Sequence, residues 1–506
     1  MPGYLKAPRA TVHDMPPEVL SRIFTVLASD SAGRMGFSLD WITVTHVCKF
    51  WYQVARDNPT LWSSINFIHP RWAQEKLIRA KSVPLHIDYH HGDIDGSEKA
   101  GKEALSLALN KMPLIKTAVI KAPFCALEGL VEKMCGLPAP IIEDFRLVCH
   151  DDAMDTSRRD LFSGIAPRLR RATFFGVQIN MKTTVFRSVE VLILGTMRTP
   201  VPIPDFLALL ANLPKLVELR TAIAFRQPDT ADSARLACMA PVVLPNCQIM
   251  QAIGAGNNAD VEQPAATPTA FLKWVTFAQP VDLTFVMSWY CDELHDNSAD
   301  AYEQVFGPLD SFYSSHDMQF VELDVVHSIH SQMDDVKEQL DLQAQSKNGT
   351  SILLTFWFLD EVFPEDRAPL AEEFAQRLPR DDLKSINIDT VDIGAHIWHS
   401  LFGELKHLEE IRAYLYGSFF SALLKKDTHN EERCIFPSLS KLILYFDGED
   451  EEKSERGCWE RLPEVLEFRS THGAPVREIG ILPQEMVPQE YLAPIESFVA
   501  VHEWTM

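Results

Sequence analysis

The chain has 506 residues, of which 46% are hydrophobic and 23% are charged, so wholesale disorder is excluded. The 47 lysines and arginines against 70 aspartates and glutamates give a net charge of −23. Such an acidic chain repels phosphate backbones, so we expect no nucleic-acid partner. No window approaches 18 consecutive apolar residues, so we also expect no membrane span and no membrane partner.

Nine cysteines are scattered along the chain, and no two of them form a CxxC pair. Residues 1–14 lack the apolar stretch of a signal peptide. We therefore predict reduced thiols and a cytoplasmic or nuclear protein.

The first predicted elements are three short helices between residues 14 and 65. Asp14 can cap the first helix, and prolines 16 and 17 suit its first turn. One face of that helix carries Val19, Leu20, Ile23, Phe24 and Leu27. The second helix starts near Ser38 or Asp40, ends at Asn58-Pro59, and carries Val44, Val47, Cys48 and Trp51. A last short helix or turn carries Leu61, Trp62 and Ile65.

Fifty residues in three helices have room for only a small core. This segment nevertheless contains an excess of large aromatic side chains: Phe24, Trp41, Phe50, Trp51, Tyr52 and Trp62. Two interpretations stay open, namely a protein partner that covers one helical face and packing against the rest of the chain.

Four short motifs in this segment resemble an F-box. They are Met15-Pro16-Pro17-Glu18, Leu20-Ser21-Arg22-Ile23-Phe24, Val47-Cys48-Lys49-Phe50-Trp51 and Pro59-Thr60-Leu61-Trp62. Their order and spacing over about 50 residues carry the resemblance, and the ending Leu61–Ile65 looks like the F-box proteins of mushroom-forming fungi. Met15 stands where leucine is usual, which keeps volume and polarity.

The resemblance implies an F-box domain at residues 12–68 that binds a Skp-family adaptor and, through it, a cullin-based ubiquitin ligase. The adaptor-binding residues carried over from the motifs are Met15, Pro16, Leu20, Ile23, Phe24, Val47, Cys48, Trp51, Leu61 and Trp62. Some of these must instead form the core of the domain itself, and the sequence does not divide the set.

An irregular repeat occupies the rest of the chain, with the frame apolar-x-x-apolar-x-apolar recurring at intervals of 20 to 48 residues. The frames begin at Ile142, Leu169, Val189, Leu216, Leu244, Leu272, Phe320, Leu353, Leu383, Leu408, Leu439 and Val476. We expect a short strand in each frame, and one more strand near Val281–Val286. We expect helices between them at Asp205–Leu213, Met333–Gln345, Leu370–Leu378 and His396–Leu405.

The predicted fold class is α/β: a small three-helix F-box followed by an irregular leucine-rich-repeat-like α/β solenoid (horseshoe) at residues 84–506. This resembles the domain that usually follows such fungal F-boxes. The alternative is an unrelated pair of α/β domains with a break at the loop-like stretch Gly254–Thr269. Residues 1–70 have a net charge of +1, so the acidity belongs to residues 71–506.

The sequence contains only weak matches to catalytic and ligand-binding motifs. Gly96–Glu103 approaches a phosphate-binding loop, with a strand-like run at Pro84–Tyr89 and a helix-like run at Ala104–Leu109, but Glu103 stands where a hydroxyl would hold magnesium. His86, His90 and His91 match no metal-ligand spacing. Asp447–Arg456 is acidic, which suggests a solvated loop or a contact for a basic target. We therefore predict no catalytic residue, no metal and no cofactor.

The function that the resemblance implies is a substrate receptor in a Skp–cullin–F-box ubiquitin ligase. The N-terminal helices would hold the adaptor, the repeat domain would hold an unknown protein target, and the outcome would be ubiquitin-dependent degradation. The alternatives are an F-box scaffold or regulator outside any ligase and, less favoured, an enzyme of unknown type.

Overall fold

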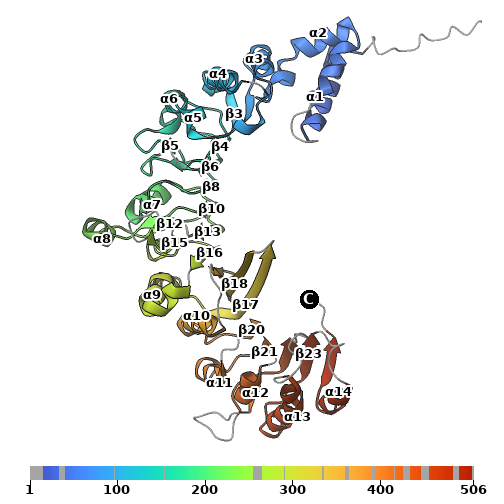
Figure 1. Cartoon of the computed structure of the whole chain (residues 1–506), viewed down its shortest axis with the longest axis vertical. Helices are drawn as coiled ribbons and strands as arrows, with labels where there is room; N and C mark the ends of the chain where they lie inside the picture. Colours follow the sequence, from blue (N-terminus) through green and yellow to red (C-terminus); the bar gives the residue numbers. More distant parts are fainter. Residues whose placement is uncertain are drawn as a thin grey trace, which may run out of the picture. The chain divides into compact units, whose positions relative to one another are not determined.

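The computed structural model describes most of the chain (Figure 1). The described residues are 15–33, 40–95, 97–151, 154–254, 265–289, 291–332, 335–358, 364–389, 394–414, 416–424, 434–445, 455–482 and 489–503. The chain divides into two compact units, the first made of residues 1–199 with 212–215 and the second of residues 200–211 with 216–506.

The first unit begins with helices and continues as a parallel sheet. Its helices are α1 (Pro17–Gly33), η2 (Asp40–His46), α2 (Lys49–Asp57), η3 (Pro59–Trp62), α3 (Pro70–Arg79), η4 (His91–Asp93), α4 (Glu98–Leu109), η5 (Met112–Leu114), α5 (Phe124–Leu127), α6 (Val131–Gly136) and η6 (Leu161–Gly164). Its main strands pair in chain order, all parallel: β1 (Ser64–Asn66), β2 (Leu85–His90), β3 (Ile115–Ala122), β4 (Asp144–Cys149), β6 (Arg171–Phe175) and β8 (Val191–Leu194). A small pair is formed by β5 (Met154–Asp155) and β7 (Val177–Gln178).

Side chains at alternate positions along the strands form the apolar core of this unit. Phe145 and Phe174 occupy neighbouring strands with their ring centroids 5.9 Å apart, and Phe162 meets Phe145 edge-on at 4.9 Å. Because side chains in a strand alternate between faces, one side of the sheet is buried and the other is more exposed, with Phe175 among its side chains. Single strands this short gain their burial from their neighbours in the sheet.

The second unit has a longer sheet with one antiparallel insertion. In spatial order its strands are β10 (Glu218–Thr221), β13 (Ile249–Ile253), β16 (Asp282–Trp289), β19 (Ser351–Phe358), β18 (Asp335–Ser346), β17 (Phe320–Gln332), β20 (Ser385–Asp389), β21 (Glu410–Tyr414), β22 (Lys441–Tyr445), β23 (Glu478–Leu482) and β24 (Ala500–Glu503). β18 is antiparallel to both of its neighbours, whereas the other pairs with a described register are parallel.

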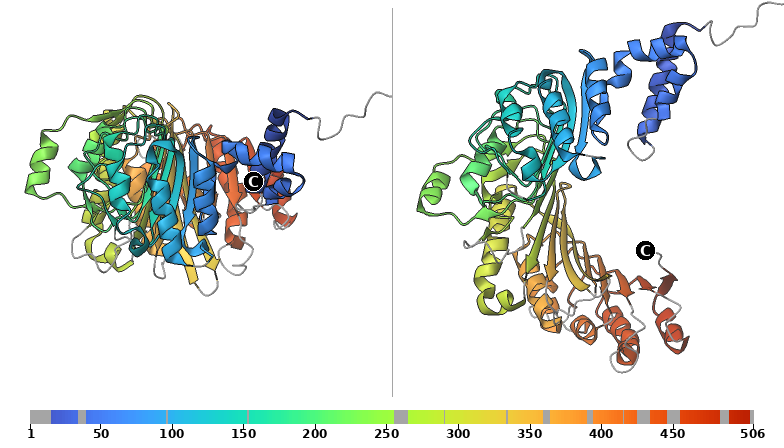
Figure 2. Two further views of the ribbon diagram at one scale, coloured as in Figure 1. Left: turned by 90° about the horizontal axis from the view of Figure 1, so that it is seen from above. Right: turned by 45° about the horizontal axis from the view of Figure 1, so that its top comes forward.

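Helices cover one face of this second sheet (Figure 2). They are α7 (Ile203–Ala211), α8 (Thr230–Ala237), η7 (Leu272–Trp274), α9 (Cys291–Ser315), α10 (Pro364–Arg377), α11 (Gly394–Ile397), the π-helix η8 (Trp398–Phe402), α12 (Gly417–Leu423), α13 (Glu455–Thr471) and α14 (Gln489–Glu496). Short strands pair beside them: β9 (Val201–Pro202) and β14 (Ala265–Ala266) on β11 (Phe225–Arg226), and β12 (Val242–Leu244) on β15 (Val275–Phe277). The fold is thus mixed α/β, with a helical N-terminus.

Most of the predicted strands are confirmed. Ten frames coincide with main-sheet strands: β4, β6, β8, β10, β17, β19, β20, β21, β22 and β23. The frame at Leu244 instead spans the end of β12 and the start of β13, and the frame at Leu272 leads into β15 of the small pair. The strand expected near Val281–Val286 is β16.

The predicted helix at Met333–Gln345 is wrong, because this segment forms strand β18 (Asp335–Ser346). Leu340, Leu342 and Ala344 are all fully buried, which is the two-residue period of a strand rather than the period of a helix. β17 and β19 flank this strand and satisfy its backbone on both sides. Tertiary pairing therefore overrides the helix-favouring glutamate, glutamine and lysine of the segment.

The other three predicted helices are confirmed as α7, α10, and α11 with η8. Of the two predicted loops, residues 255–264 and 447–454 lie outside the described residues. Their described ends are not all loop, because Ala265–Ala266 form β14 and residues 455–456 begin α13. Within the part that the structure describes, no helix is long and apolar enough to cross a bilayer.

Candidate functional site

The N-terminal helices enclose a small apolar core. Leu20 and Phe24 lie one turn apart on α1 and are fully buried. Ala55 of α2 and Leu61 of η3 are buried with them, and so is Trp41 of η2. Residues four apart share one helix face, so the buried side of α1 is the side of Leu20 and Phe24.

Trp62 closes this core where η3 ends. Its indole Nε1 donates a hydrogen bond to the carbonyl oxygen of Ala55 at 3.0 Å, and its ring meets that of Trp41 edge-on at 5.1 Å. The guanidinium of Arg79, from α3, lies 4.4 Å from the centroid of the Trp62 ring. The Trp62 side chain is therefore part of the interior and also contacts helix α3. The predicted second helix is divided into η2 and α2, so this segment has four helices and not three.

Trp51 is placed differently, at the boundary between core and surface. Its ring is 5.1 Å from Phe24, and its backbone N–H donates to the Sγ of Cys48, which caps α2. The side chain is half-buried, yet its indole Nε1 is inaccessible and has no hydrogen-bond partner among the described residues. A buried N–H without an acceptor costs about 1–3 kcal/mol, so it marks a place where a missing acceptor would stabilise the structure.

The side of α1 that adjoins Leu20 and Phe24 is apolar and exposed. We call its members the α1 stripe: Val19, Ile23, Val26 and Leu27. Val26 is 55% exposed, and the stripe lines a groove of about 580 Å³ together with Glu18 and Arg22. Val47, 59% exposed, adds a further apolar side chain after η2. An apolar helix face of this kind is typical of a protein-binding site.

The structure divides the ten predicted adaptor-binding residues into three groups. Four are buried in the domain core: Leu20, Phe24, Leu61 and Trp62. Three are half-buried: Met15, Cys48 and Trp51. Three are exposed: Pro16, Ile23 and Val47. The motifs did not include Val19, Val26 and Leu27, although the predicted apolar face of the first helix contained Val19 and Leu27.

The three histidines that we considered for a metal do not converge. His86 bonds Thr117 Oγ1 through its Nδ1 at 2.9 Å, His90 pairs with Asp88 at 3.0 Å, and His91 lies 3.5 Å from Glu98. Across the described ranges, no group of three or more histidine, cysteine or acidic side chains could hold a metal ion.

The phosphate-loop-like segment also has a structural explanation. Its flanking strand and helix are present as β2 and α4, but Gly101 lies inside α4, where an added Cβ would come within 2.5 Å of Ile94 Cδ1. The glycine therefore permits close packing of α4. Gly96 lies outside the described residues.

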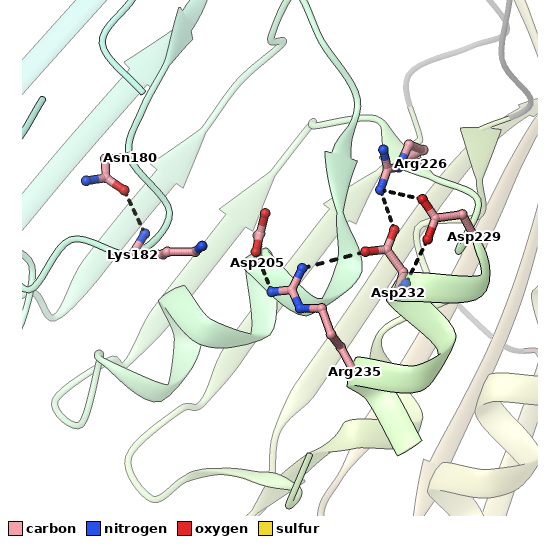
Figure 3. Close-up of polar contacts among 7 residues, drawn as sticks. All are labelled: Asn180, Lys182, Asp205, Arg226, Asp229, Asp232 and Arg235. Atoms are coloured by element: carbon pink, nitrogen blue, oxygen red, sulfur yellow. Dashed lines mark hydrogen bonds and ion pairs between the residues drawn. The ribbon is translucent and has the colours of Figure 1, made fainter. Parts of the chain in front are cut away.

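One ion-pair cluster of the second unit joins two arginines to three aspartates (Figure 3). Arg226 bonds Asp229 at 3.3 Å and Asp232 at 2.5 Å, while Arg235 bonds Asp205 at 2.6 Å. Asp229 also caps α8 by accepting the backbone N–H of Asp232. These contacts fasten α8 to β11 and α7, which is a structural role.

Comparison with known families points to the helical segment. Residues 12–68 match the F-box-like family. Among curated proteins, none matches the chain. The four short motifs and the α1 stripe all lie within the matched range, so the chain carries an F-box-like domain at its N-terminal end.

Proposed function

We propose that this protein is a substrate-receptor subunit of a Skp–cullin–F-box ubiquitin ligase. The observation that carries the proposal is the exposed α1 stripe on an F-box-like domain. F-box domains bind Skp-type adaptors, and the adaptor would cover this stripe together with Val47. Ubiquitin chemistry would come from the other subunits of the ligase, so the chain itself would act by binding.

Burial of the stripe supplies the driving force for adaptor binding. Fully burying one large aliphatic side chain is worth about 1.5–3 kcal/mol, so Ile23, Val26 and Leu27 supply enough apolar surface for a stable contact. Met15, Pro16, Cys48 and Trp51 would lie at the edge of this contact. The buried members Leu20, Phe24, Leu61 and Trp62 would act by holding the helices in place.

We further propose that residues 84–506 form a degenerate leucine-rich-repeat-like solenoid, of the horseshoe kind found after fungal F-boxes, that holds a protein target. The support is the row of parallel strands in each unit, with frame anchors just before the strands. In such arrays each repeat buries its apolar face on its neighbours and leaves a continuous strand surface for binding.

Co-purification tests this proposal. The full chain is co-expressed with a Skp-family adaptor and a cullin, then purified through a tag on the chain. We expect both partners to be recovered, and we expect Val26→Asp to reduce adaptor recovery at least tenfold. Val243→Asp is the matched control, because Val243 is also exposed but lies on β12 of the second unit.

Three results would count against the proposal. Absence of adaptor in the wild-type eluate would refute adaptor binding. Equal recovery with both variants would refute the role of the α1 stripe. Recovery of the adaptor without the cullin would refute the ligase and favour a scaffold outside it.

A further inference from the structure

The more exposed face of the first sheet carries apolar and basic side chains across strands β3, β4, β6 and β8 (Figure 1). Parallel register places Lys121 of β3 beside Val148 of β4, and Val148 beside Phe175 of β6. In the neighbouring row, one pleat earlier, Arg146 of β4 lies beside Thr173 of β6. Because side chains alternate along a strand, these five project from the same face.

The next residue along each strand lies in the core, and Leu147 and Phe174 are fully buried there. Arg171, two residues before Thr173, and Ile193, the register partner of Thr173 on β8, therefore also project from the exposed face. We call the whole set the basic–apolar face: Lys121, Arg146, Val148, Arg171, Phe175 and Ile193.

Phe175 provides a fixed aromatic surface on this face. Its side chain is 39% exposed. Gly195, directly after β8, leaves room for the ring, because a Cβ added to Gly195 would overlap the Phe175 ring atoms. The ring therefore lies against the backbone of the next strand, and little freedom would be lost when a ligand covers it. Exposed aromatic side chains in fixed positions are typical of protein-binding surfaces.

The cations of this face share one carboxylate. Arg146 donates to both carboxylate oxygens of Asp144 at 3.3 Å, and Arg171 Nε donates to Asp144 Oδ2 at 3.0 Å. Lys121 is partly exposed, and within the described part of the chain its side chain forms no hydrogen bond or ion pair. Three positive charges therefore meet one negative charge, and N–H groups of both guanidinium groups remain available to a ligand.

The other acids near these strands are already engaged. Asp151, after β4, accepts the backbone N–H of Phe124 at 2.7 Å. Three further acids lie 3.0 to 4.0 Å from basic partners: Asp88 from His90, Glu143 from Lys116, and Glu190 from Arg170. Residues 1–199 contain 25 lysines and arginines against 20 aspartates and glutamates, whereas residues 200–506 contain 22 against 50. An anionic ligand is therefore attracted by the first unit and repelled by the second.

We propose that the basic–apolar face binds an acidic segment of the target protein that also carries a large apolar side chain. Carboxylates of the segment would pair with Lys121 and with the free N–H groups of the two arginines. The apolar side chain would pack on Phe175 beside Val148. This deepens the proposed function, on which it rests, by naming the chemistry of the target and the surface that receives it.

Fluorescence anisotropy with the full chain tests the inference. The probe is a labelled peptide of glycine and serine with three glutamates and two leucines. One comparison peptide carries glutamine in place of each glutamate, and the other carries alanine in place of each leucine. We expect the probe to bind at least tenfold more tightly than the glutamine peptide and at least threefold more tightly than the alanine peptide.

A matched pair of double variants separates this face from general effects of charge and exposure. Lys121→Gln/Phe175→Ala should weaken binding of the probe at least fivefold. Lys182→Gln/Phe498→Ala should change it less than twofold, because Lys182 is exposed in the loop between β7 and β8, and Phe498, 45% exposed, lies between α14 and β24. Lys121→Gln alone removes no contact within the described residues, so a weaker affinity in this variant cannot come from misfolding.

Three results would overturn the inference. They are equal binding of the glutamate and glutamine peptides, an equal loss of affinity in both double variants, and tighter binding of a labelled oligouridylate than of the acidic probe, which would make the face a nucleic-acid site. Adaptor recovery is measured on the same variants and is expected to stay unchanged. Failure of this face and failure of the adaptor contact are therefore distinguishable.

Discussion

Trp62 donates its indole N–H to the carbonyl oxygen of Ala55, seven residues earlier, at 3.0 Å inside the helical core. This bond ties η3 to the last turn of α2, and it assigns Trp62 to folding. Trp51, eleven residues before Trp62, has its indole N–H unpartnered among the described residues and its ring at the surface boundary. The two tryptophans of the F-box-like motifs therefore have different roles: Trp62 stabilises the core, and Trp51 lies at the boundary with the surface.

Substitution of Trp62 tests its structural role. Trp62→Phe removes the hydrogen bond and leaves a cavity, and it leaves the Ala55 carbonyl without its donor. We expect a loss of about 2–4 kcal/mol in the stability of the helical domain. Hydrogen exchange of α1 and α2 measures this, with Tyr52→Phe, on an exposed residue, as the control. Unchanged protection in Trp62→Phe would contradict the assignment.

Substitutions on the buried side and on the exposed side of α1 should have different effects on stability and on adaptor binding. Leu20→Ala truncates a fully buried side chain and should cost about 2–5 kcal/mol of domain stability. Val26→Ala, on the exposed stripe, should change stability by less than about 0.5 kcal/mol while weakening adaptor binding. Thermal melting and adaptor titration on both variants check this. A destabilised Val26→Ala with unchanged adaptor affinity would reverse our assignment of the faces.

Lys76 links stability to alkaline pH. It is buried in α3, its Nζ donates to the Ser64 carbonyl at 3.2 Å, and burial lowers its pKa to about 8. The folded state therefore holds fewer protons than the unfolded state between about pH 8 and the ordinary lysine pKa of 10.5, so this residue adds stability as pH rises through that window. The resulting gain in the free energy of unfolding is at most about 3 kcal/mol.

Lys76→Met isolates this contribution from other titrating groups. The melting temperature of the variant minus that of the wild type should fall as pH rises from about 7 to about 10.5, since only the wild type regains stability. A pH-independent difference would show that Lys76 stays protonated and solvated in the folded protein.

Asp324 of β17 and Asp389 of β20 should change stability with pH in the opposite sense. Burial raises the pKa of Asp324 and Asp389 in the folded protein, so the folded state holds more protons and their contribution to stability falls as pH rises through the raised values. Asp324→Asn/Asp389→Asn should therefore be at least as stable as the wild type at about pH 7, and its advantage should shrink toward about pH 4, as measured by denaturant unfolding. A variant that is less stable at neutral pH would show that these carboxylates are structural.

Arg469 supports the chain before β22 from inside the fold. Its Nη1 and Nη2 donate to the carbonyl oxygens of Ile435 and Phe436 at 3.0 and 2.8 Å, and burial lowers its pKa to about 10. Phe436 adopts a positive φ of 53°, which these bonds help to hold. Arg469→Met should cost about 2 kcal/mol or more, because both buried carbonyls lose a donor.

Denaturant unfolding and hydrogen exchange of β22 measure the effect of Arg469→Met. Arg461→Met is the control, since Arg461 is on the same helix and bonds Ser421 in a less buried place. A variant more stable than the wild type would mean that the desolvation of the guanidinium outweighs its hydrogen bonds.

Much of the fold was predictable because local patterns and tertiary packing agree. The frame at Leu439 places its first apolar residue just before β22 and buries Leu442 and Leu444 within it. β18 was not predictable from composition, since its pairing with β17 and β19 decides its conformation. The one sequence feature that favours a strand here is the two-residue spacing of the apolar residues Leu340 and Leu342.

The candidate site was predictable only in part. The motifs locate the F-box-like domain, but which side of α1 is free depends on how η2 and α2 pack against Leu20 and Phe24. Val26 could not be distinguished from a core residue before that packing was known. The row Asp324, Asn387 and Arg412 was not predictable from the sequence, because parallel register places these distant residues side by side.

The most direct test of the central claim is an isothermal titration of a Skp-family adaptor into the full chain. We predict one-to-one binding with a submicromolar dissociation constant, on the order of −8 kcal/mol or tighter, weakened at least tenfold by Val26→Asp and unchanged by Val243→Asp. Absence of binding to the folded wild-type chain would contradict the account.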